Sequence, residues 1–222
     1  MLDHMMFETR CAGCERVGAA LCTTCRFALV GRLPQHQEHG VIAAVPFAGR
    51  ARDVVLSLKY RNRRQVARHL GSLLVNRLVE SGCCADLESV TWAPTNAKRR
   101  RNRGFDQGEE IARTVARQLR LPCRRLLDRR GRAVTQTGLS RAERLDAPEF
   151  AARPDVAGMS VLVVDDVVTT GATLHAARDA LLQQGAREVV LAAVASTLAP
   201  SGARTRGKVM PFRQLAVART AA

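Results

Sequence analysis

The segment that most constrains the fold is residues 160–196, where two apolar runs enclose an amphipathic stretch. Residues 160–164 read SVLVV and residues 188–196 read EVVLAAVAS, which predicts two strands that are buried on both faces. Between them, residues 173–185 carry a helical pattern that ends at Gly185. Its inward face has three apolar residues: Leu174, Ala177 and Leu181. Strand, helix and strand in this order predict a βαβ unit, and therefore a parallel sheet with a right-handed crossover.

The chain before this unit alternates short apolar runs with helical patterns, as expected for an α/β domain of ordinary size. Three further strands are expected, at residues 41–47, 89–94 and 123–128. Three further helices are expected, at 51–60, at 65–81 and after Asp106, which forms a capping-box pattern with Glu109. Residues 98–105 (KRRRNRGF) are expected to form a basic loop, and residues 129–155 a long loop that acts as a lid.

The positive charge of the chain is local. The formal net charge is +15, and residues 98–144 hold 15 Lys and Arg against five Asp and Glu. Residues 201–222 add five basic residues and no acidic ones. Such segments attract polyanions, although a solvated arginine-rich surface is the alternative. No apolar run is long enough to span a membrane and the start, MLDHMMFETR, has no secretory pattern, so we expect a cytoplasmic protein.

Four of the seven cysteines form two closely spaced pairs. Cys11, Cys14, Cys22 and Cys25 read C-x2-C-x7-C-x2-C, the pattern of a closed structural zinc site. A reducing compartment favours metal over disulfides, so we predict Zn²⁺ here. The alternatives are reduced thiols without metal, or a redox pair.

The end of the first buried run carries the clearest chemistry. Residues 165–173 read DDVVTTGAT, which places Asp165 and Asp166 at the carboxyl end of a strand, where ligands bind in parallel sheets. Amides from Thr169 to Thr173 would lie at a helix N-terminus, which favours a phosphate, and Gly171 permits close approach. Adjacent carboxylates suit a vicinal diol. The segment therefore predicts a site for a phosphorylated ribose.

Two other interpretations of this segment stay open. Asp166 can simply cap the turn while the threonines satisfy the first amides of the helix. Alternatively, the two acids can hold Mg²⁺ in a phosphotransfer site.

The segment VLVVDDVVTTGATL resembles the phosphoribosyl diphosphate (PRPP) loop of type I phosphoribosyltransferases. The wider pattern resembles the ComF family, also called competence-protein F or GntX-like. Four features occur in that family's order: the paired cysteines, VVLSLKY with Lys59 and Tyr60, APTNAKRRRNRGFDQ (93–107), and QTGLSRAER (136–144), followed by the loop itself. The resemblance covers about residues 8–196.

The resemblance implies a type I phosphoribosyltransferase-like α/β fold: a parallel sheet flanked by helices, with a small N-terminal four-cysteine zinc module. The corresponding domains are a zinc module at 1–30, a linker at 31–40, the phosphoribosyltransferase-like domain at 41–200 and a basic tail at 201–222. It also implies PRPP, carried with Mg²⁺, as the ligand.

The resemblance also assigns roles to residues. The expected PRPP-binding residues are Asp165, Asp166, Thr169, Thr170, Gly171, Ala172, Thr173, Lys98 and Arg103. The expected catalytic residues are Asp165, Asp166, Arg141 and Arg144, the two arginines closing over the leaving pyrophosphate from the lid.

Three functions remain open at this point. The first is a PRPP-dependent phosphoribosyltransferase, linked to DNA uptake (competence) or nucleotide salvage. The second is a non-catalytic competence factor that binds single-stranded DNA through Arg99, Arg100 and Arg101, with PRPP as regulatory ligand. The third is a zinc-held scaffold that contacts DNA-uptake proteins.

Overall fold

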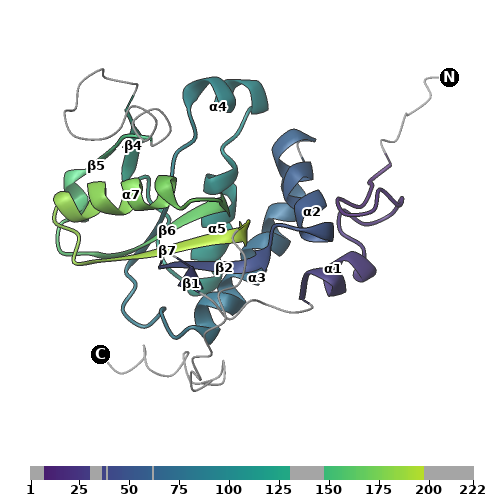
Figure 1. Cartoon of the computed structure of the whole chain (residues 1–222), viewed down its shortest axis with the longest axis horizontal. Coiled ribbons are helices and arrows are strands. Elements are labelled where there is room, and N and C mark those ends of the chain that lie inside the picture. Colours follow the sequence, from purple (N-terminus) through teal and green to yellow (C-terminus); the bar gives the residue numbers. More distant parts are fainter. Residues whose placement is uncertain (1–7, 31–36, 39, 62, 131–147, 198–222) are drawn as a thin grey trace.

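The computed structural model describes residues 8–30, 37–38, 40–61, 63–130 and 148–197. Its centre is a sheet with the strand order β1-β2-β7-β6-β3 (Figure 1). Four strands are parallel: β2 (Val41–Pro46), β7 (Glu188–Ser196), β6 (Ser160–Val168) and β3 (Ser89–Trp92). The short β1 (Gln37–Glu38) pairs antiparallel with β2. The predicted parallel α/β sheet is confirmed.

Helices cover both faces of this sheet because its strands are apolar on both sides. One face packs against α2 (Gly49–Tyr60), α3 (Ala67–Glu80), which follows the 3-10 turn η1 (Arg64–Val66), and α5 (Gln107–Leu119). The other face packs against α7 (Ala172–Gln183) and a small antiparallel ribbon of β4 (Leu127–Arg129) and β5 (Phe150–Ala152), with the 3-10 turn η2 (Pro154–Val156). The inward residues expected for α7, namely Leu174, Ala177 and Leu181, are fully buried.

The N-terminal cysteine segment, residues 8–30, is part of the main core. It contains the helix α1 (Thr23–Val30), which lies against α2 (Figure 1). Cys11, Leu21 and Cys25 are buried in the same apolar cluster as the residues of α2 and α3. The segment is thus held by apolar contacts and not only by its cysteines.

Three predictions about local structure are wrong. Residues 98–105 are not a loop, because Ala97–Arg103 forms the helix α4. This stretch contains no glycine or proline, and its long unbranched side chains favour a helix. Gly104, with φ of 74°, ends it, and its N–H donates to the Arg100 carbonyl over 2.8 Å.

The strand expected to end at residue 164 continues through both aspartates to Val168, because Asp165, Val167 and Val168 pair with β7. The segment 129–155 is likewise not all loop. Its final residues form β5 and the start of η2, and β5 pairs with β4. Among the described residues, no helix is both long and apolar enough to cross a membrane.

Candidate functional site

The predicted ribose-phosphate segment lies at the carboxyl edge of the sheet, and we call residues 165–173 the socket. β6 ends at Val168, and the exposed Thr169 and Thr170 lead into α7. Gly171 precedes the helix with φ of 81°, a conformation that favours glycine. The sequence therefore brings Thr169, Thr170, Gly171, Ala172 and Thr173 into one turn, as predicted.

The first turn of α7 presents backbone N–H groups toward the socket. The Ala172 N–H makes a long hydrogen bond of 3.4 Å to Thr170 Oγ1, and the His175 N–H donates to the Gly171 carbonyl. The first amides of a helix have no partner within the helix and carry the positive end of its dipole. A phosphate group is a suitable acceptor for these donors.

The two aspartates of the socket have different partners. Asp166 forms an ion pair of 2.9 Å with Nζ of Lys59, and only 13% of its side chain is exposed. Asp165 Oδ1 accepts the N–H of Asp166 over 2.7 Å. Burial, together with the charge of Asp166, raises the pKa of Asp165 to about 8. Asp166 is thus paired with a lysine, whereas its neighbour Asp165 favours the protonated form at neutral pH.

Asp106 joins the loop after β3 to the start of α5. Its carboxylate accepts the N–H of Thr95 at 2.9 Å and the N–H of Gly108 at 3.1 Å, so it is the N-cap of α5. Burial raises the pKa of Asp106, although these N–H groups act in the opposite direction. The Asp106 charge also acts on Asp165, which places the start of α5 beside the socket.

The basic helix α4 stands above this edge of the sheet (Figure 1). Arg103 lies over the ring of Tyr60, 5.2 Å from its centroid, and donates to Gln107 Oε1 at 2.9 Å. Nε2 of the buried Gln107 has no hydrogen-bond partner among the described residues. The side chains of Arg100 and Arg101 are exposed.

Four predicted residues are only partly covered by the structure or not at all. Lys98 and Arg99 belong to α4, but their side chains lie outside the described part. Arg141 and Arg144, the predicted lid arginines, fall in residues 131–147, which the structure does not describe.

The four cysteines of the predicted zinc site come together. Their Sγ atoms all lie within 4.8 Å of one another, and the Sγ atoms of Cys14 and Cys22 are 3.7 Å apart. Tetrahedral zinc with bonds of about 2.3 Å separates its sulfur ligands by about 3.8 Å. A Cβ on Gly13 would approach Cys25 Sγ to 2.9 Å, so only glycine fits there. The cluster can hold a metal of this kind.

Backbone N–H groups and burial shift the pKa values of these thiols in different directions. Burial alone would raise the pKa of Cys11, but the N–H groups of Cys22, Gly13 and Cys14 lower it to about 6. The Cys22 N–H to Cys11 Sγ distance is 3.3 Å. Burial and the neighbouring thiols raise the pKa of Cys25. An N–H···S network of this type favours thiolate, the form that binds metal.

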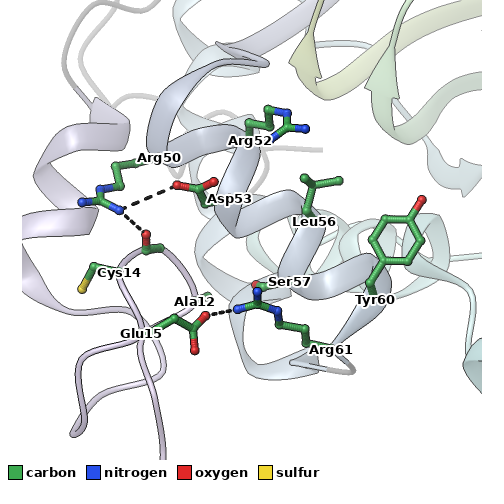
Figure 2. Close-up of a pocket in the computed structure, with 11 residues that line it drawn as sticks. Ala12, Cys14, Glu15, Arg50, Arg52, Asp53, Leu56, Ser57, Tyr60 and Arg61 are labelled. Atoms are coloured by element: carbon green, nitrogen blue, oxygen red, sulfur yellow. Dashed lines mark hydrogen bonds and ion pairs between the residues drawn. The ribbon is translucent and has the colours of Figure 1, made fainter.

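A groove of about 510 Å³ separates the cysteine segment from α2 (Figure 2). Arg50 crosses it, donating to the Gly13 carbonyl at 2.5 Å, and Glu15 pairs with Arg61. Arg52, Leu56 and Tyr60 lie on the side of α2 that points away from Cys14 and Glu15.

Sequence reasoning did not assign Lys59, Tyr60 or Gln107 to the site. The sequence presents Lys59 and Tyr60 only as part of the VVLSLKY motif, and Gln107 only as the end of RGFDQ. The motifs were the available signal, but which atoms they contact is set by the packing of α2 and α5.

Comparison with known proteins agrees with this architecture. Residues 106–211 match the family model of the phosphoribosyl transferase domain. The chain is 26% identical over 213 residues to the DNA utilization protein YhgH of Escherichia coli O6:H1, covering 89% of this chain and 93% of that protein. Its counterpart in Escherichia coli K12 is 24% identical over 218 residues, with the same coverage.

One solved structure with a similar arrangement is a glutamine PRPP amidotransferase from B. subtilis. It is 20% identical, with a TM-score of 0.41, over 59% of this chain and 26% of that longer chain. An adenine phosphoribosyltransferase from Thermoanaerobacter pseudethanolicus is 14% identical, with a TM-score of 0.40, over 65% of this chain and 86% of that one. Residues 106–211 thus match the phosphoribosyl transferase domain model, and over most of its length the chain is similar to the YhgH proteins.

Proposed function

We propose that this chain binds PRPP in the socket at the carboxyl edge of its sheet. The observation that carries the proposal is the direct succession of Asp165 and Asp166 and the first turn of α7, within a phosphoribosyl transferase domain. The carboxylates accept hydrogen bonds from the ribose diol. The amides from Thr169 to Thr173 donate to the 5-phosphate.

The pyrophosphate end of PRPP would point toward α4 and the start of α5. This end carries most of the ligand's negative charge and arrives with Mg²⁺. Arg103 lies beside Tyr60 and Gln107 there, and Lys98 belongs to the same helix. Positive charge at this position would stabilise pyrophosphate as it leaves. In this proposal Arg141 and Arg144 complete the site from the lid.

Lys59 has a role of its own in this proposal. In the free protein its ammonium group neutralises Asp166 over 2.9 Å. A diol hydrogen-bonded to Asp166 would compete with this contact, so Lys59 is free to turn toward the nearby phosphate oxygens. The lysine would thereby compensate the Asp166 carboxylate before the ligand arrives.

The cellular role we propose is the handling of DNA, because the similar proteins from Escherichia coli are named DNA utilization proteins. Arg99, Arg100 and Arg101 of α4 are the residues that we propose contact nucleic acid at the mouth of the socket. We further propose the divisions drawn from the sequence, with residues 41–200 as the phosphoribosyltransferase-like domain and residues 1–30 as a zinc module.

Isothermal titration with Mg²⁺ and PRPP tests the proposed ligand. The unaltered protein should bind, and Asp165→Asn/Asp166→Asn should weaken binding by at least about tenfold, because hydrogen bonds to charged groups contribute about 1.5–3 kcal/mol. Asp179→Asn makes the same chemical change on the exposed side of α7 and should bind normally. Equal PRPP affinities in all three proteins would rule out the socket as the binding site of PRPP.

Turnover needs a separate measurement. Pyrophosphate release from PRPP should be followed with a panel of bases and amines, with and without single-stranded DNA. Release that depends on one acceptor and on Asp165 would identify a transferase. Binding without release under every condition would leave PRPP as a regulatory ligand.

A further inference from the structure

A second hollow of about 700 Å³ lies on the outer surface of α3 and α5, and we call it the arginine groove. Its lining includes four arginines and one histidine, with a single carboxylate: Arg64, Arg68, Arg113, Arg117, His69 and Glu110. It is a different hollow from the socket and from the groove beside the cysteine segment. We propose that the arginine groove binds the sugar-phosphate backbone of a single-stranded nucleic acid.

Two of the arginines that line this groove have no carboxylate partner among the described residues. Within the described part of the chain, neither Arg68 nor Arg117 forms an ion pair with a carboxylate, and both side chains are exposed. Arg113 pairs with Glu109 at 2.6 Å, but a guanidinium has five N–H donors and keeps others for a ligand. Planar guanidinium groups suit phosphate oxygens particularly well.

The close packing of the two helices sets the position of these arginines. A Cβ on Gly71 of α3 would approach Thr114 Cγ2 of α5 to 2.7 Å, so glycine permits this approach. Arg113 and Arg117 are four residues apart on α5, which corresponds to about 6 Å along the helix, whereas Arg64 lies in η1 and Arg68 in the first turn of α3. Arginines from both sides thus line the same hollow, which suits a chain of successive phosphates.

The cysteine segment closes one side of the groove. Ala20 lines it, and Arg26 of α1 reaches across to His69 Nε2 at 3.3 Å while also donating to the Leu21 carbonyl. Because arginine can only donate, His69 Nε2 must accept. This contact fixes a further positive charge at the edge of the groove.

Arg64 connects the groove with the residues that follow α4. Arg64 lies 4.4 Å from the Phe105 ring centroid and donates to the Gly104 carbonyl, just after α4 with its exposed Arg100 and Arg101. Cations spread over this length suit a polymer better than a single nucleotide. A concave channel accepts one strand, whereas a duplex would meet only its rim.

Among the described residues, the lining of the groove contains no Phe, Tyr or Trp, so the contacts would be mainly electrostatic and independent of sequence. The inference deepens the proposed role in DNA handling by naming the surface and the kind of nucleic acid. It does not depend on PRPP binding.

Fluorescence anisotropy with a labelled 20-nucleotide oligothymidine, measured over a range of NaCl concentrations, tests this surface. Arg68→Ser/Arg117→Ser should weaken binding by about tenfold or more. It should also reduce the slope of log K against log[NaCl] by about 1.4, since each phosphate contact on a single strand contributes about 0.7. Arg125→Ser/Arg178→Ser removes two charges on the opposite side of the sheet and should retain most of the affinity and the slope.

Further measurements distinguish a single-stranded nucleic acid from other ligands of the groove. Both double variants should keep the melting temperature and PRPP affinity of the parent, so a loss of oligonucleotide binding would leave the socket proposal intact. An equal loss of oligonucleotide affinity in the two double variants would contradict the proposal for the groove. Equally strong binding of a duplex of the same length would also contradict it. Displacement of the oligonucleotide by polyglutamate or ATP at equal charge concentration would assign the groove to an acidic protein or to a nucleotide instead.

Discussion

Asp165 and Asp166 are adjacent in the chain but differ in their electrostatic surroundings. Asp166 has the ammonium group of Lys59 at 2.9 Å, whereas burial and the charges of Asp166 and Asp106 raise the pKa of Asp165. The free socket therefore carries a proton near neutral pH. A ligand that donates hydrogen bonds to both carboxylates would favour loss of that proton.

PRPP affinity should accordingly depend on pH. Ionisation of Asp165 is favoured above about pH 8, so affinity should rise from pH 6 to pH 8, by up to about tenfold per pH unit, and then level off. Asp165→Asn should remove the rise in PRPP affinity between pH 6 and pH 8. This variant therefore separates the titration of Asp165 from the titration of PRPP itself. Calorimetry in buffers of different ionisation enthalpy should show proton release at pH 7, and its absence would contradict this assignment.

The Asp165 carboxyl group affects folding stability with the opposite pH dependence to its effect on PRPP affinity. Its folded pKa lies above its unfolded value, so its contribution to stability is present at low pH and is lost as the pH rises through about 8. The sequence predicted that the two aspartates lie together at the end of a strand. It could not predict the raised pKa of Asp165 or the ion pair of Asp166, because Asp106 and Lys59 reach the socket from other parts of the chain.

At the level of elements, the turn before α7 depends on the backbone of Gly171. Gly171→Ala would place a side chain at φ of 81°, which costs about 1–2 kcal/mol, and would stiffen the turn that we propose binds phosphate. Gly82→Ala is a matched control, because Gly82 has φ of 73° at the end of α3, with open space around its Cβ position.

Both glycine variants should lower the melting temperature by a few degrees, and only Gly171→Ala should weaken PRPP binding. Thermal unfolding and calorimetry on the same samples measure the two effects. A similar loss of affinity in Gly82→Ala would mean that general destabilisation, and not the turn, controls binding.

The elements that could be predicted are those with a clear apolar period. β6, α7 and β7 follow directly from such patterns, as do α2, α3 and α5. The helix α4 was not predicted because it has no apolar face: its seven residues are one alanine and six polar residues. β4 and β5 were missed as a ribbon because three-residue strands depend on their partner, which is distant in sequence.

At the scale of the whole molecule, the cysteine segment and the domain share one core. Cys11, Leu21 and Cys25 pack with Val54 and Leu58 of α2. The spacing of the cysteines predicted the cluster of sulfur atoms, and the structure brings them within 4.8 Å. The spacing did not show that the cluster supports α2, since that depends on the apolar residues between the cysteines.

Removal of a metal from this cluster should therefore destabilise the entire domain. We expect chelation to lower the melting temperature by about 6–12 °C, which corresponds to about 3 kcal/mol for a chain of this size. Elemental analysis should find about one zinc per chain in the untreated protein. Cys14→Ser/Cys22→Ser should abolish both the bound zinc and the effect of the chelator on the melting temperature. The control Cys83→Ser/Cys84→Ser should keep the metal. A melting temperature that does not change with chelator would exclude a structural metal.

The helix α2 touches both the cysteine segment and the socket. Arg50 reaches the Gly13 carbonyl from its first turn, and Lys59 reaches Asp166 from its last. A shift of this helix would alter both contacts at once, so we expect metal binding at the cysteine cluster to change ligand binding at the socket, and a linkage of this kind acts equally in both directions. Under the proposed function, the availability of metal in the cell would then change the affinity of the socket for PRPP.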